Sequence, residues 1–169
     1  MHSLRKTLEH VQQSPVFQAW FANHPASYLS SFFKIIEKED VEWWQVDFYY
    51  PKGDTITSFV IDDKVKLATK DSAVFKKEKE PVLALDLTKV SIDIQKALQV
   101  AHTLQQEKYH MEKTSKTIVL LQTLNRTIWN ISLLTSTFKL VNIRIDAKTG
   151  DVLEDSIVPL FDFGHQKAS

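Results

Sequence analysis

The chain has 169 residues, 43% of them hydrophobic and 25% charged, which is enough apolar material for a folded core. Its 21 basic and 21 acidic residues cancel, so no long-range field attracts a nucleic acid. It contains no cysteine and only three glycines, which argues against disulfides, thiolate chemistry and glycine-rich phosphate loops. We therefore expect no nucleic-acid partner and no cofactor.

The sequence also predicts where the protein is found. No segment approaches the roughly 18 consecutive apolar residues of a membrane-spanning helix. The amino terminus, Met1 to Lys6, is not followed by the apolar region of a secretory signal. We expect a cytoplasmic protein that does not associate with membranes.

The first half reads as helices followed by three strands. Leu4, Leu8 and Val11 have helical spacing, and Ser14-Pro15 is typical of the start of a second helix, which ends before Pro25. Aromatic and β-branched segments then predict three strands, at residues 28–36, 43–50 and 55–61.

A charged stretch at residues 64–90 reads as a solvated connection, with a short strand at residues 82–87. After it the pattern repeats. Ser91 is a candidate N-cap for a helix that runs to about Tyr109, and Ile94, Ala97 and Leu98 begin its apolar face. Three further strands are predicted, at residues 117–124, 128–134 and 138–145.

The two halves match in detail as well as in order. Trp44 and Asp62 in the first half have nearly the same spacing as Trp129 and Asp146 in the second. This pattern favours internal duplication over two unrelated hairpins built from common strand residues.

We therefore predict an α+β fold made of two αβββ units, each a helix packed on an antiparallel sheet. The units span residues 1–63 and 91–155, residues 64–90 connect them, and residues 156–169 form an apolar strand or tail.

The second half resembles the PepSY domain across residues 91–154. The resemblance rests on the helix segment Ala97-Leu98 to Ala101 and on the closing turn from Asp146-Ala147 through Thr149-Gly150 to Val152-Leu153. It implies a tandem, cystatin-like arrangement of helix and sheet with a non-catalytic role. Domains of this family accompany peptidase propeptides and have been proposed to restrain peptidases. The first half lacks the Thr-Gly turn, and no peptidase domain or export signal accompanies the motif.

The residues that carry chemistry form no recognisable site. None of the six histidines belongs to an HExxH motif or a close helical pair, and no GxSxG elbow presents a serine nucleophile. We predict no catalytic, cofactor-binding or metal-binding residues, and hence a protein that is not an enzyme.

The candidate binding surface lies on the second strand. Strand side chains alternate, so Trp43, Gln45, Asp47 and Tyr49 share one face, and the apolar Trp44 set faces the helix. Aromatic residues beside polar groups are typical of a partner-binding face. The alternative is that the two sheets stack and bury Trp43 and Tyr49 between them.

The resulting functional prediction is a regulatory, non-enzymatic module that binds a protein or peptide through a sheet face or edge. The alternative is a small-molecule-binding or enzymatic domain with a pocket between helix and sheet. A homodimer formed through strand edges is a third interpretation.

Overall fold

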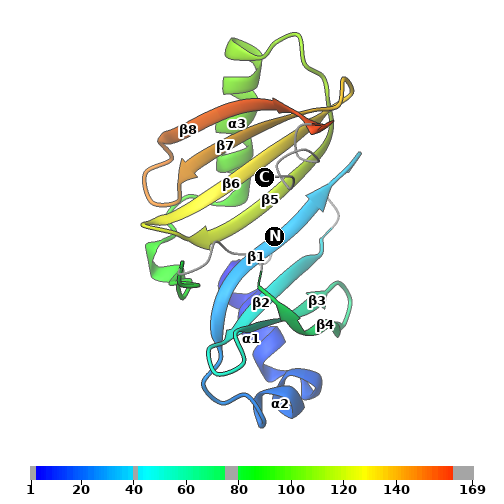
Figure 1. Ribbon diagram of the computed structural model, residues 1–169, viewed down its shortest axis with the longest axis vertical. Coiled ribbons are helices and arrows are strands. Elements are labelled where there is room, and N and C mark those ends of the chain that lie inside the picture. Colours follow the sequence, from blue (N-terminus) through cyan, green and yellow to red (C-terminus); the bar gives the residue numbers. More distant parts are fainter. Residues whose placement is uncertain (1–2, 40–41, 75–79, 162–169) are drawn as a thin grey trace, which may run out of the picture.

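The computed structural model describes residues 3–39, 42–74 and 80–161, and their strands form one eight-stranded antiparallel sheet (Figure 1). The strand order is β4-β3-β2-β1-β5-β6-β7-β8, so the two halves of the chain meet where β1 pairs with β5. The strands are β1 (Tyr28–Ile36), β2 (Trp44–Tyr50), β3 (Thr55–Ile61), β4 (Val65–Ala73), β5 (Thr114–Thr123), β6 (Thr127–Thr135), β7 (Lys139–Asp146) and β8 (Val152–Pro159).

Three α-helices accompany the sheet: α1 (Leu4–Gln13), α2 (Pro15–Phe21) and α3 (Ile94–Lys108), with a 3-10 turn at Leu87–Lys89. The Ser3 side chain caps α1, and Ser14 caps α2 with Pro15 at its first position, as the sequence predicts. The cap of α3 is Asp93, whose carboxylate accepts the Lys96 amide hydrogen at 2.8 Å. The predicted cap, Ser91, is wrong: it lies three residues before the start of α3, in the segment whose amides donate to the Ala147 carbonyl oxygen.

A row of buried side chains crosses the sheet from one half to the other. Residues paired directly across antiparallel strands lie on the same face, so the register can be followed from strand to strand. The row runs through Phe59, Val46, Phe32, Leu121, Trp129 and Ile145, and each of these is 0% exposed. The core is therefore continuous across the joint between the halves.

The helices cover this apolar face in two places. α1 contacts β2 and β3, and α3 contacts β6 and β7 (Figure 1). From α2, the ring of Phe17 lies 4.8 Å from that of Phe48, and the ring of Trp20 lies 5.4 Å from that of Phe59. Among the described residues, no helix contacts β1 or β5 as extensively, so these two central strands lie between the two regions of the sheet that the helices cover.

The predicted fold of two separate αβββ units, PepSY-like or cystatin-like, is wrong. Each half supplies four strands, and the halves join edge to edge in one sheet. The predicted alternative of stacked sheets is also wrong, for the same reason. Joining through β1 and β5 pairs backbone groups that two separate small sheets would leave at their edges.

The additional strands lie in segments that sequence patterning described differently. β4 occupies part of the charged connection at residues 64–90, and β8 extends from the second unit into the apolar tail. The short strand predicted at residues 82–87 is absent. There, the Leu85 amide makes a single backbone hydrogen bond to Leu29 at 2.9 Å, where a bulge interrupts β1. The other six predicted strands and the helices are confirmed within a few residues.

Candidate functional site

A cleft of about 810 Å³ opens beside the start of β2 and the end of β3, between α1 and the segment that enters α3. The first turn of α1 forms one wall and the segment entering α3 forms the other. We call it the Trp44 cleft and define it by Leu4, Lys34, Trp44, Ile61 and Ile92, which all line it. Its volume is within the range of small-molecule sites, roughly 300–1,000 Å³.

Lys34 and Trp44 carry the most informative chemistry of the cleft. Lys34 is only 3% exposed, although lysine is rarely buried so deeply in proteins. Its ammonium nitrogen lies 5.0 Å from the centroid of the Trp44 ring, at cation–π distance. Trp44 is half-buried and packs edge-on against Phe32 at 5.8 Å. A cation and an indole thus lie beside each other on the face of the sheet that is otherwise covered by apolar core residues.

The second half contains an equivalent tryptophan, Trp129, which does not line a cleft. Trp44 pairs with Ile61 one residue before Asp62, and Trp129 pairs with Ile145 one residue before Asp146. Both aspartates accept the amide hydrogen of the residue two positions later, at 3.1 and 2.8 Å. The two tryptophans therefore hold equivalent positions in the two halves.

Trp129 is covered by the segment of the chain that leads into α3. The indole nitrogen of Trp129 donates to the Ile92 carbonyl oxygen at 3.2 Å, and Trp129 is 0% exposed. The amides of Ser91 and Ile92 both donate to the Ala147 carbonyl oxygen, at 2.9 and 3.1 Å. The first-half position equivalent to Ile92 falls at residue 2, outside the described residues.

Lys34 also departs from the second half. The β1–β2 register ends with Phe33 opposite Gln45, and one step further places Lys34 opposite Trp44. In the second half Leu121 is paired with Trp129, and Leu121 is fully buried and apolar. Local departures from the core pattern tend to occur at functional or strained positions. Sequence reasoning did not identify Lys34, but a signal existed: it lies between Phe32 and Ile36 in the alternation that places side chains on the core face.

Charged groups of both signs surround the cleft. Arg5 and Lys6 lie in the first turn of α1, which has no acidic residue. Of the acidic residues that line the cleft, Asp62 pairs with Lys66 at 2.8 Å and Asp93 caps α3. Two more, Glu42 and Asp63, are exposed at the rim.

Of the predicted aromatic face, Trp43 also lines the cleft, while Gln45, Asp47 and Tyr49 lie on the other side of β2. Asp47 is 7% exposed, and its carboxylate accepts hydrogen bonds from Ser31 Oγ at 2.7 Å, Gln45 Nε2 at 2.9 Å and Ser58 Oγ at 2.6 Å. Tyr49 is also 7% exposed, and its ring lies 5.5 Å from that of Tyr28. Trp43 and Gln45 are half-buried. Three of the four predicted residues thus lie on β2 and Trp43 immediately precedes it, and Asp47 and Tyr49 are largely inaccessible to a partner.

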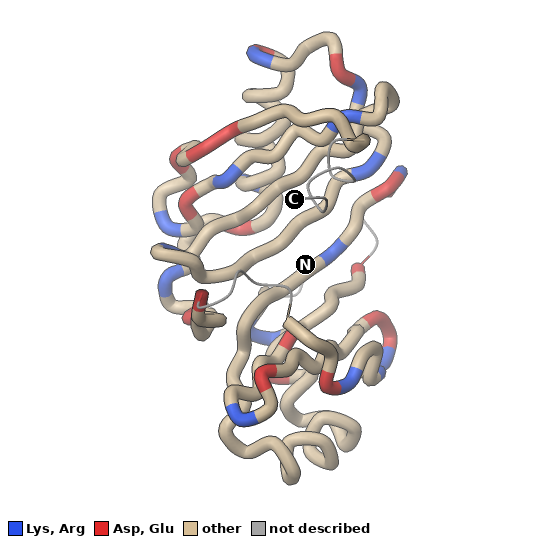
Figure 2. The backbone as a smooth tube through the Cα atoms, in the orientation of Figure 1, with Lys and Arg blue, Asp and Glu red and all other residues tan. Residues whose placement is uncertain are grey.

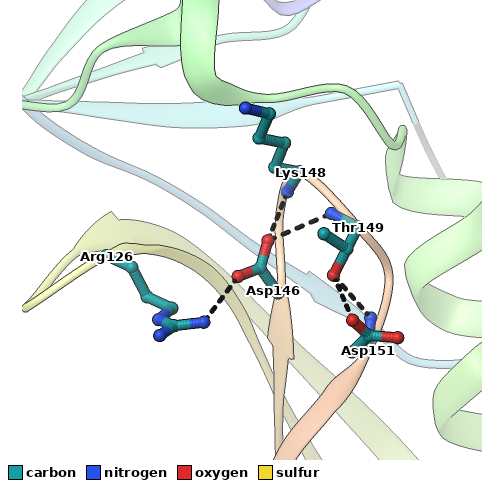
Figure 3. A network of polar contacts seen from close by, with 5 residues as sticks. All are labelled: Arg126, Asp146, Lys148, Thr149 and Asp151. Atoms are coloured by element: carbon teal, nitrogen blue, oxygen red, sulfur yellow. Dashed lines mark hydrogen bonds and ion pairs between the residues drawn. The ribbon is translucent and has the colours of Figure 1, made fainter.

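The closing turn of β7 is a structural network (Figure 3). The Asp146 carboxylate accepts the amide hydrogens of Lys148 and Thr149 at 2.8 and 3.0 Å, and Arg126 donates to its other oxygen at 3.1 Å. Gly150 has a φ of 83°, which favours glycine. Burial raises the pKa of the Asp146 carboxyl, but these hydrogen bonds outweigh it, so the pKa lies below its ordinary value.

This network predicts a pH-dependent loss of stability. We expect Asp146→Ala to lower the free energy of unfolding by about 1–3 kcal/mol at neutral pH, because two amides lose their acceptor. Since folding lowers the pKa, the wild-type carboxylate contributes above its unfolded pKa of about 3.9 and its contribution fades at lower pH. Urea unfolding of both proteins from pH 7 to pH 3 checks this. A difference that stays constant over the whole range would contradict it.

Other site types receive no support from the described part of the chain. Residues 3–39, 42–74 and 80–161 contain no group of three or more His, Cys, Asp or Glu side chains arranged to hold a metal ion. Over the same residues, each helix is too short or too polar to cross a membrane.

Comparisons with known proteins add little to the geometry. No family model matches the sequence, and no curated protein matches it either. Among solved structures, the chain is similar to a "putative lipoprotein" from Clostridium difficile 630, with 16% identity and a TM-score of 0.49 over 85% of this chain and 90% of that one. A similarity this low supports no inference about function, so the proposals below rest on the residues alone.

Proposed function

We propose that this protein is a binding protein whose ligand occupies the Trp44 cleft. The observation that carries the proposal is the contrast between the halves: a half-buried Trp44 lines a cleft beside Lys34, whereas the counterparts of these residues, Trp129 and Leu121, are apolar and fully buried. An accessible indole beside a buried cation supplies contact area and a fixed polar group, which small-molecule sites combine.

The proposal follows the predicted alternative of a pocket between helix and sheet. Recognition of a protein or peptide through Trp43, Gln45, Asp47 and Tyr49 stays a prediction with less support, because Asp47 and Tyr49 are 7% exposed. The PepSY resemblance, the duplication, the homodimer and the cytoplasmic location also stay predictions. No catalytic step is proposed.

Blocking the cleft should abolish ligand binding without unfolding the protein. Leu4 lines the cleft and is half-buried, so Leu4→Tyr adds volume at its wall. We expect compounds from a fragment library to raise the melting temperature of the wild type and to lose this effect in Leu4→Tyr. A ligand at 100 times its Kd stabilises a protein by about 2.7 kcal/mol.

The matched control is Leu124→Tyr, which makes the same change at an exposed leucine in the turn between β5 and β6. This variant should respond to the compounds as the wild type does. Compounds that stabilise both variants equally would place the binding site elsewhere and contradict the proposal. A library without a single stabilising compound would contradict it as well.

A further inference from the structure

The outer edge of β8 is open. Among the described residues, β8 has β7 on one side and no strand on the other (Figure 1). Three of its large apolar side chains are exposed: Val152 (39%), Leu153 (42%) and Ile157 (36%). A long edge strand with exposed apolar side chains is a template for pairing with another strand.

The opposite edge of the sheet, β4, is protected against such pairing. Its register with β3 shifts twice, and Asp71 within it has a φ of 48°. A second copy of β4 paired symmetrically about Ala68 would place Lys66 opposite Lys70 of that copy, where like charges repel. Bulges and lysines are means by which edge strands avoid association. The sheet therefore offers one edge for pairing, so a symmetric pair of chains closes without growing into a fibre.

The direction of the backbone groups of β8 follows from one hydrogen bond at its end. The Leu160 amide donates to the Phe138 carbonyl oxygen at 2.9 Å, so the backbone groups of Leu160 face β7. This direction alternates from residue to residue in an antiparallel strand, and the register with β7 is unbroken over the last six residues of β8. The N–H and C=O groups of Asp155 and Ile157 therefore point away from the sheet. Pro159 points outward too, where its missing N–H removes no hydrogen bond to β7.

We propose that the protein forms a two-fold symmetric dimer in which β8 pairs antiparallel with β8 of a second copy. With the two-fold axis at Ser156, Asp155 of each chain lies opposite Ile157 of the other, and each such pair exchanges both of its hydrogen bonds. This register gives all the outward backbone groups of these two residues a partner, and it requires no N–H from Pro159. An axis at Asp155 would instead place two carboxylates opposite each other, which is unfavourable.

The side chains of β8 fit the register centred at Ser156. Glu154 lies opposite Val158 of the second copy, and Asp155 lies opposite Ile157, so no carboxylate faces another. Both carboxylates already have an ion-pair partner within their own chain, at 2.8 and 2.6 Å. The exposed Ile157 side chains of the two copies are diagonal neighbours across the axis, within reach of each other. The chain also has no net charge that would keep two copies apart.

Cysteine cross-linking tests the register, because the chain has no cysteine of its own. Residues that lie opposite each other without shared hydrogen bonds have Cα atoms about 4.5 Å apart, and a disulfide spans about 4.4–6.8 Å. Ser156 lies opposite its own copy in this way. With oxidised glutathione as the oxidant, we expect Ser156→Cys to form a covalent dimer. The matched control, Val158→Cys, lies on the same face away from the axis and should form about tenfold less.

Sedimentation equilibrium of the wild type measures the affinity. The pairing uses one short strand from each chain, which is on the scale of transient interfaces, so we expect a Kd on the order of 100 μM. Ile157→Pro should weaken the dimer about tenfold, because each chain loses an outward N–H. It leaves the hydrogen bonds to β7 in place. If this variant does not fold, Ser156→Lys provides the same test by placing two lysines opposite each other.

Three results would overturn the proposal or part of it. A wild type that stays monomeric up to about 1 mM overturns the dimer. A dimer that persists unweakened in both Ile157→Pro and Ser156→Lys forms through another surface and overturns the pairing of β8. Equal cross-linking of Ser156→Cys and Val158→Cys overturns the register. Because β8 contributes no residue to the Trp44 cleft, the proposed binding function is tested separately.

Discussion

Replacing Phe32 with alanine is expected to lower the free energy of unfolding by about 3–5 kcal/mol. Phe32 is 0% exposed and lies on β1, between Val46 of β2 and Leu121 of β5. Its ring therefore belongs to the core of both halves, at the joint that makes them one sheet. Removing it leaves a cavity that neither half can close by itself.

Urea unfolding followed by circular dichroism and by tryptophan fluorescence measures this loss. Because the core is continuous, the two signals should change together in one transition, in the wild type and in the variant. Phe33→Ala is the matched control: Phe33 is half-buried on the opposite face, so we expect a loss of about 1 kcal/mol. Two separate transitions would contradict the single core and would indicate that the two halves unfold independently.

Asp47→Ala is expected to cost about 2–3 kcal/mol, because it removes the common acceptor of three donors. Two of these donors, the hydroxyls of Ser31 and Ser58, belong to residues that are 9% and 5% exposed. Without the carboxylate they lose their partner where water has little access. The same change would have little effect on stability if Asp47 were an exposed binding residue, as the sequence alone predicts.

Equilibrium unfolding at neutral pH compares this variant with Asp63→Ala, a change at an exposed aspartate expected to stay within about 0.5 kcal/mol of the wild type. Because Asp47 lies on the face opposite the cleft, compounds that stabilise the wild type should also stabilise Asp47→Ala. An Asp47→Ala protein as stable as the wild type would show that the network contributes nothing.

Local patterns in the sequence were sufficient to predict most elements. The spacing of Leu4, Leu8 and Val11 and the Ser14-Pro15 pair predicted α1 and α2, and the alternation around Val46 predicted which face of β2 meets the core. Such patterns depend on neighbours in the chain, so they can be read from one sequence.

The joint between β1 and β5 could not be predicted in this way. Alternation tells which side chains point inward, but it does not tell which strand lies beside which, since any apolar strand can pair with another. β4 was missed because its edge position leaves it exposed and charged, with Lys66 and Lys70 on the surface. Charged residues protect edge strands, and the same residues resemble a loop in sequence.

The candidate site could be predicted only in part from the sequence. A pocket between helix and sheet was among the predicted alternatives, but its location depends on where α1 and α3 lie over the shared sheet. The charged residues do not locate it either: they are spread over helices, turns and outer strands, and β6 carries none (Figure 2). Lys34 stands out only once its neighbours across the strands are known.

The central claim is that the Trp44 cleft binds a ligand, and ¹⁹F NMR of protein labelled with 5-fluorotryptophan tests it most directly. The chain has four tryptophans, and Trp44→Phe assigns the Trp44 signal. On adding a stabilising compound, we predict that the Trp44 signal shifts, while the signals of Trp20 and Trp129, which are 5% and 0% exposed, stay in place. A Trp44 signal that stays unchanged while the compound stabilises the protein would contradict the claim.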